Sequence, residues 1–161
     1  MKLAEAMKTV LSLTGTPMIS PPPSSSPETQ IDWSKIESIL SRTGQRKGNL
    51  LQLSVPRAET ITENGMGVPP SMGVATAINF QMVGEDAATT GDFVLIANEV
   101  NPVVRALTEH GIAVTAIHNH MLHESPRLFF LHFWGVGTAE KLTQGLKAAL
   151  DKTNSIKRKQ S

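Results

Sequence analysis

Cysteine and tyrosine are both absent from the 161 residues of the chain. Without thiols, a disulfide framework, thiolate catalysis and a cysteine-ligated zinc site are excluded, and so is a lipid anchor on an acylated cysteine. Aromatic residues make up only 4% of the sequence, which argues against a platform for stacking nucleic-acid bases. There is also no GxGxxG run and no P-loop, so we do not expect nucleotide binding through a glycine-rich loop.

The chain also lacks a strong charge of either sign and a long apolar run. Its formal net charge of +1 does not call for nucleic acid or an acidic partner. The apolar residues near the start are interrupted by Glu5, Lys8 and Thr9, which makes a poor signal peptide and is too short for a membrane span. We therefore expect a cytoplasmic protein whose partner is a small molecule, with no nucleic acid and no membrane. Neither the identity of that ligand nor the oligomeric state follows from the sequence.

The composition nevertheless supports a folded unit, because 40% of the residues are hydrophobic and the length suits one domain. We expect residues 1–30 to be a short disordered leader. It would contain a marginal amphipathic helix over 1–13, followed by a linker of proline and serine, PPPSSSP, over 21–27. Residues 31–153 would form the domain, and residues 154–161 a short basic tail.

Periodicity and turn residues predict an alternating series of elements. A turn is expected at Asn64-Gly65, and a polar loop over 84–91. The order of the elements indicates an α+β domain in which helices pack on one face of an antiparallel sheet. Helices are predicted over 31–42, 101–110 and 138–150, and strands over 50–55, 71–83, 92–97, 112–120 and 128–134.

Histidines are concentrated in one stretch, since four of the five lie between Gly111 and Gly137. The strands over 112–120 and 128–134 are so close in sequence that an antiparallel hairpin is the simplest arrangement. Side chains alternate along a strand, so a register that sets even positions against even positions brings His118, His120 and His132 to one side. Glu124, in the connecting loop, can fold over them. His123 is kept out of this set.

Three imidazoles and a carboxylate form a ligand set for Zn, Mn, Fe, Ni or Cu. The spacing His-x-His-x3-Glu with a later His is similar to the metal box of the cupins, although cupins need a longer barrel. The sequence therefore predicts a pocket that binds a divalent metal, in the form of a metal-dependent hydrolase or lyase or of a site that simply holds the ion. In the enzyme, His118, His120 and His132 would hold the metal, and Glu124 would move the proton of a bound water. Glu124 could instead be the fourth ligand.

Other interpretations remain open. A non-catalytic module could bind a small anion or a partner peptide, with the histidines and Arg127 as donors. The histidines could also form a purely structural network. Ser125 lies near them, but it lacks the glycine-rich elbow usual for a nucleophilic serine. Arg57 is expected to be a surface residue that donates hydrogen bonds to loop carbonyls.

Several runs over residues 31–153 resemble the LppY/LpqO family of bacterial proteins, which is largely without assigned function. They are IDWSKIESIL, SVPRAET, GDFVLIANEVNPVVRALTEHGIAVTAIHNHML and ESPRLFFLHFWG. The resemblance implies that some relatives are exported. It also implies that some carry further histidines just after the position of His132, where this chain has Trp134 and Val136. We assign ligand binding to Asn119, Arg127 and Trp134. The residues that match the family's motif are His118, Asn119, His120, Glu124, Pro126, Arg127 and His132.

Overall fold

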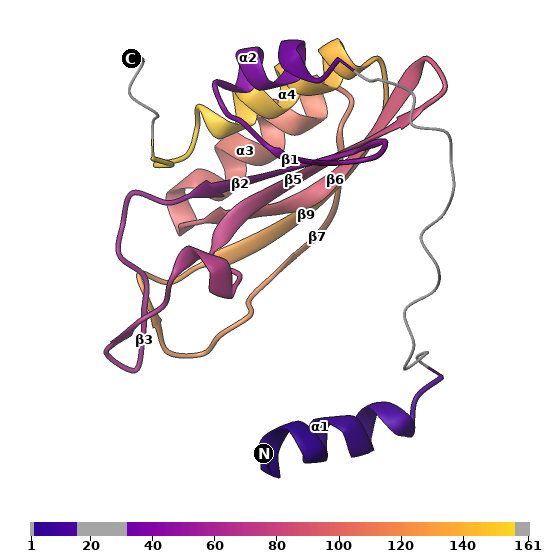
Figure 1. Ribbon diagram of the computed structural model, residues 1–161. Helices are drawn as coiled ribbons and strands as arrows, with labels where there is room; N and C mark the ends of the chain where they lie inside the picture. Colours follow the sequence, from indigo (N-terminus) through magenta and orange to yellow (C-terminus); the bar gives the residue numbers. More distant parts are fainter. Residues whose placement is uncertain (1, 16–31, 157–161) are drawn as a thin grey trace.

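The computed structural model describes residues 2–15 and 32–156, and its centre is a six-stranded antiparallel sheet with strand order β1-β2-β5-β6-β9-β7. Helices α2, α3 and α4 all lie on the same side of this sheet (Figure 1). The predicted α+β class is therefore confirmed. The strands are β1 Gln45–Lys47, β2 Leu50–Pro56, β5 Ala75–Val83, β6 Asp86–Leu95, β7 Ala113–His118 and β9 Phe129–Gly137, and the helices are α2 Ser34–Leu40, α3 Ala97–Glu109 and α4 Ala139–Leu150.

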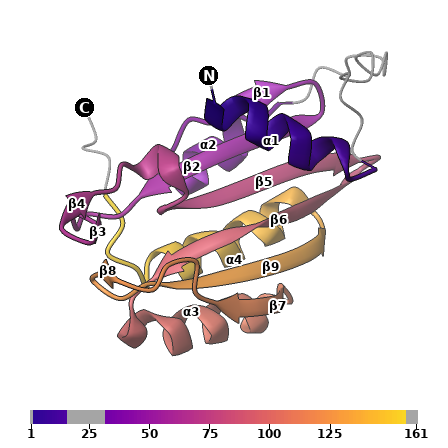
Figure 2. The same cartoon turned by 90° about the horizontal axis from the view of Figure 1, so that it is seen from below.

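The main core lies between the sheet and these helices, and it follows from the two periodicities of the sequence. Alternate residues of β2 are buried, while α4 contributes an apolar stripe. Gly145 lets α4 approach the C-terminal end of α3 closely, because a Cβ there would lie 2.6 Å from the Cβ of His110. The opposite face of the sheet, which we call the open face, lies away from α2, α3 and α4 and is seen from below in Figure 2. Buried residues of β2 and α4 include Leu51, Leu53, Val55, Leu142, Leu146 and Leu150.

A second, three-stranded sheet lies at one end of the large sheet. Its order is β4-β3-β8, from β3 Thr62–Glu63, β4 Met66–Gly67 and β8 Glu124–Ser125. The predicted turn at Asn64-Gly65 joins β3 to β4, with φ of 50° and 80° at its two residues. Since β3 also pairs with β8, this sheet ties the β2–β5 connection to the loop between β7 and β9. A separate apolar cluster lies here, formed by Ile61, Val74, Val94, Leu128 and Phe130.

Several element boundaries differ from the prediction, most clearly those of β6, α3 and β5. Strand β6 begins at Asp86, so most of the expected polar loop over 84–91 is strand; its pairing with both β5 and β9 outweighs the weak strand preference of its residues. Helix α3 begins at Ala97 with Pro102 inside it, because Glu99 accepts a hydrogen bond from the backbone N–H of Ile96 at 3.0 Å. Strand β5 begins at Ala75, after a short 3-10 helix, η1 Pro70–Met72.

The expectation that Arg57 lies at the surface is wrong, because its side chain is only 1% exposed. Its guanidinium binds both carboxylate oxygens of Glu99, at 2.6 and 3.0 Å, and donates to the carbonyl of Val94 at 2.8 Å. Glu59 adds a further ion pair at 2.9 Å. A charge this deeply buried is stable only with such partners. Arg57 therefore joins the end of β2, the end of β6 and the start of α3.

The two ends of the described chain differ in their contacts with the domain. Helix α1, Lys2–Ser12, has no buried residue, and the expected leader boundary near residue 30 lies outside the described residues. At the other end, hydrogen bonds continue past Thr153: Asn154 accepts from the N–H of Ala58 at 2.8 Å, and Ile156 donates to the carbonyl of Pro56 at 3.0 Å. No helix among residues 2–15 and 32–156 is long and apolar enough to cross a membrane.

Candidate metal centre

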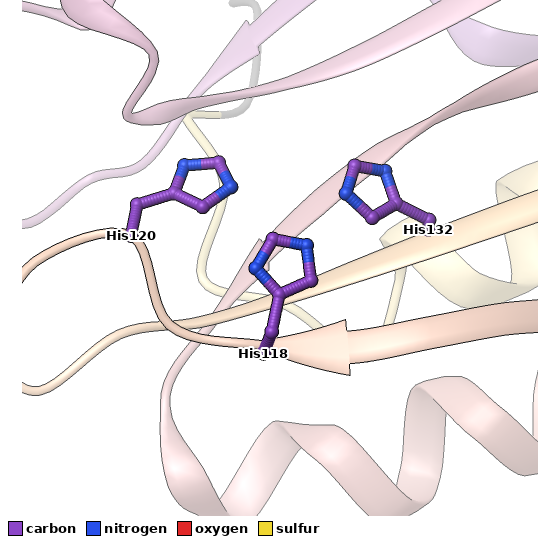
Figure 3. Close-up of side chains that lie close together, drawn as sticks. All are labelled: His118, His120 and His132. Atoms are coloured by element: carbon purple, nitrogen blue, oxygen red, sulfur yellow. The ribbon is translucent and has the colours of Figure 1, made fainter.

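Three histidines meet on the open face of the sheet. His118 ends β7, His120 follows in the loop, and His132 lies in β9 (Figure 3). Strands β7 and β9 pair antiparallel with Ala116 opposite His132 and His118 opposite Phe130. The predicted hairpin is thus confirmed, and even positions face even positions over residues 116–118; a bulge between Val114 and Ala116 shifts the register before them. This register is the reason that residues from both strands share one face.

The three imidazoles lie close enough to act as one group. One ring nitrogen of each histidine lies within 4.8 Å of the others. The ring centroid of His118 is 4.9 Å from that of His120 and 4.8 Å from that of His132, so His118 is the middle member. Figure 3 shows the rings turned towards a shared space. The predicted meeting of the three histidines is therefore observed.

Two neighbours hold His120, the member that lies outside a strand. The buried ring of Phe130 stacks on its imidazole, with a centroid distance of 3.5 Å and an interplanar angle of 13°. The side-chain amide of Asn119 donates to the carbonyl of Leu128 at 2.5 Å and joins the two ends of the hairpin loop. Asn119 thus positions the chain beside the site through a bond within the protein.

Asp92 is the carboxylate that the sequence analysis missed. It lies on β6 directly opposite His132 and on the same face. Its Oδ2 is 4.0 Å from Nε2 of His120, and its Oδ1 is buried without a hydrogen-bond partner. The strand predicted over 92–97 begins at Asp92, and an acid at the end of a strand is ordinarily a solvent-exposed boundary residue. In the structure Asp92 lies inside β6, which is paired on both sides, and an acid in the middle of such a strand indicates a functional site.

The pKa values of Asp92 and His120 are shifted by burial and by the charges of their neighbours. Burial raises the pKa of Asp92 above its usual value, and the charges of the nearby His132, His120 and His118 offset only part of this increase. Burial lowers the pKa of His120, Asp92 raises it, and the other two histidines lower it again, so that the net shift is downward. A lowered pKa keeps the imidazole of His120 neutral at neutral pH, the form in which histidine binds metals.

Glu124 and Arg127 are bound to their own loop. The Glu124 side chain is fully buried; it accepts from the N–H of Leu128 at 3.1 Å and from Arg127 at 3.2 Å. Arg127 also donates to the carbonyls of Met121 and Leu122, at 3.3 and 3.2 Å. These contacts hold the connecting loop in shape. The catalytic role predicted for Glu124 and the ligand-binding role predicted for Arg127 remain predictions.

Two other residues of the prediction lie at the edge of the site. Trp134 shares the open face with His132, two positions along β9, and its side chain is 49% exposed. It therefore forms an open wall next to the histidines, and its assignment to ligand binding remains a prediction. His123 is exposed in the loop and does not belong to the cluster.

Fold and site together define an α+β domain that carries a cluster of three histidines on the sheet face opposite α2, α3 and α4. The chain belongs to the family described as Domain of Unknown Function (DUF1259), whose model matches residues 34–152. No curated protein and no solved structure matches the chain. The match covers every element of the large sheet, all three helices packed on it and each residue of the cluster.

Proposed function

We propose that this protein binds a divalent transition-metal ion through His118, His120 and His132. The observation that carries the proposal is the approach of one nitrogen from each imidazole to within 4.8 Å of the others. Nitrogens around a tetrahedral ion at ~2.0–2.1 Å lie about 3.4 Å apart, so a small rotation of each ring would close the cluster on a metal. Imidazole nitrogen suits Zn, Fe, Ni and Cu, and Mn accepts it beside oxygen ligands.

The position of the cluster supports chemistry at the ion as well as its retention. Three ligands from one sheet face leave the solvent side open to water or a substrate, which is the arrangement of catalytic rather than structural zinc sites. A metal-bound water has a pKa near ~7, so such a site can supply hydroxide for hydrolysis or a base for a lyase reaction. We therefore propose a metal-dependent hydrolase or lyase as the catalytic form.

The alternative, a non-catalytic module for a small anion or partner peptide, finds less support. It needs Arg127 as a donor towards the ligand, but Arg127 donates to two carbonyls and to Glu124 within its own loop. The alternative also uses the histidines as donors, but burial lowers the pKa of His120, and a neutral imidazole donates one N–H where a cationic one donates two. These two observations favour a metal over an anion.

The test uses full-length protein purified without a histidine tag and treated with a chelator. Metal analysis before treatment, and thermal shifts after addition of Zn, Mn, Fe, Co or Ni, would measure binding. An ion present at ~100 times its Kd should add roughly 2.7 kcal/mol to the free energy of unfolding. His120→Ala should abolish this gain. His123→Ala is the matched control, since it removes an exposed histidine of the same loop outside the cluster. Equal shifts in both variants, or none in the wild type, would refute the proposal.

A further inference from the structure

On the basis of the proposed metal site, we infer that Asp92 is its fourth protein ligand, so that the ion is held by three imidazole nitrogens and one carboxylate oxygen. Asp92 comes from β6, the strand that pairs with β9 on the side away from β7. The ligands would then derive from three adjacent strands and the loop after β7. Such a site joins parts of the chain that are far apart in the sequence.

The first argument is position. Asp92 and His132 are direct cross-strand partners, and residues opposite each other in an antiparallel pair project from the same face. The Oδ2 atom of Asp92 lies 4.0 Å from Nε2 of His120, which is closer than the 4.8 Å limit that encloses the three histidine nitrogens. Among the described residues, the group of ligand atoms within 4.8 Å of one another contains only the three histidines, so the Asp92 carboxylate would have to turn towards them to reach a shared ion.

The second argument is the state of the carboxylate itself. Its Oδ1 atom is buried and has no hydrogen-bond partner among the described residues. Buried carboxylates are normally paired or bound to metals, because an unsatisfied charged oxygen is costly to remove from water. The two acids of the described chain that are buried as whole residues have such partners: Glu99 binds Arg57, and Glu124 binds Arg127 and the N–H of Leu128. Glu63 also has one buried oxygen without a partner. Asp92 faces three imidazoles instead, and a cation between them would satisfy it.

This ligand set narrows the class of ion. Calcium and magnesium prefer sites made of oxygen atoms alone, whereas three nitrogens and one oxygen suit Zn, Fe, Mn, Co or Ni. The single carboxylate cancels one of the two charges of the ion, and the site keeps a net charge of +1 when the imidazoles are neutral. That charge would favour a substrate oxygen carrying partial or full negative charge as a fifth ligand, since an ion with four protein ligands must expand its coordination to bind substrate.

The experiment compares Asp92→Asn with Asp86→Asn, a matched change at an exposed acid on the same strand. Metal-free protein of each variant is titrated with Co²⁺, and the visible absorption of the bound ion reports its ligands. The wild type should give an intense spectrum typical of low coordination. Asp92→Asn should weaken binding by about 10- to 100-fold, a loss typical even of groups that only support a ligand, and should also shift the spectrum. Asp86→Asn should reproduce the wild type.

Each other outcome has a defined meaning. A weaker affinity with an unchanged spectrum would overturn the inference, because Asp92 would then only orient a ligating histidine. Unchanged affinity and spectrum would overturn it as well. If wild type and His118→Ala alike fail to bind Co²⁺ or any of the other ions, the proposed function itself fails. Should Asp92→Asn not fold, judged by circular dichroism of the metal-free protein, Asp92→Ala gives the same readouts.

Discussion

Asp92 and His132 lie directly opposite each other on β6 and β9, and their side chains share the open face of the sheet. This pairing places a carboxylate with an unsatisfied, buried oxygen next to a cluster of imidazoles. In the absence of an ion such an arrangement costs free energy, because one oxygen of the carboxylate is buried without a hydrogen-bond donor. Such a site lowers the stability of the metal-free protein, and binding of an ion would recover this free energy.

The first prediction follows from this cost. In metal-free protein at pH 8, Asp92→Asn should raise the free energy of unfolding by about 1 kcal/mol, because an unsatisfied amide is less costly to bury than a carboxylate. Urea denaturation in the presence of a chelator measures the change. With a saturating ion the order should reverse and the wild type should be the more stable protein. A variant less stable than the wild type in both conditions would contradict the prediction.

The second prediction concerns the buried pair of Arg57 and Glu99, whose side chains are 1% and 8% exposed. Glu99→Gln should lower the free energy of unfolding by about 3–5 kcal/mol, because it weakens a buried ion pair and leaves Arg57 partly uncompensated. The control is Lys147→Met, which breaks the exposed pair of Lys147 with Asp151 and should cost at most ~1 kcal/mol. Urea denaturation of both variants makes the comparison. Equal losses in the free energy of unfolding would show that burial does not make the Arg57 pair more important for stability than an exposed pair.

The third prediction concerns acid. Burial alone would raise the pKa of Glu59, but hydrogen bonds from Arg57 and Asn154 outweigh it and lower the pKa from its usual 4.5. A folded-state pKa below the unfolded value contributes stability that is fully present above pH ~4.5 and is lost as the pH falls through the folded-state pKa. Glu59→Gln should therefore flatten the decline of stability at pH values below ~4.5. Urea midpoints measured between pH 7 and pH 3 test this, and parallel curves for variant and wild type would count against it.

The parts of the fold and of the site that depend on contacts between neighbouring segments could be predicted from the sequence, and the parts that depend on distant segments could not. The hairpin of β7 and β9 was predictable because the two strands are neighbours in the sequence, and their pairing over residues 116–118 brings His118 to His132. Asp92 joins them through pairing with a strand much later in the chain, which no local pattern reveals. The start of α3 was missed for a related reason: the side chain of Glu99 caps the helix before Asn101, the residue that looked like the start.

The fourth prediction concerns the N-terminal segment. Helix α1 buries none of its side chains, so a chain that begins at Glu28 should melt within a few degrees of the full-length protein. The contrasting change is a chain that ends at Thr153, which removes the hydrogen bonds of Asn154 and Ile156 to Ala58 and Pro56 and should melt at a lower temperature. Differential scanning calorimetry measures both. A large loss on removing residues 1–27 would show that the segment packs on the domain.

The last prediction separates two roles for Glu124. Its carboxylate is fully buried and accepts from Arg127 and from the N–H of Leu128, within the loop that follows His120. Glu124→Gln keeps the shape of the side chain but removes the charge. If Glu124 holds the loop, as these contacts indicate, the free energy of unfolding should fall by about 1–2 kcal/mol while the affinity for the ion changes little. Chemical denaturation and metal titration of the same sample measure both quantities.

Arg127→Met supplies the matched comparison, because it removes the other half of the same pair and leaves a buried carboxylate without its cation. Its cost should equal or exceed that of Glu124→Gln, and the double variant should cost less than the sum of the two single variants, as expected for residues in direct contact. A general base would behave differently. Glu124→Gln would then leave stability unchanged and lower the turnover of small esters, lactones or phosphoesters by ~100-fold or more. That result would return Glu124 to the catalytic role that its position after His120 suggested, with Asp92 still available as the ligand.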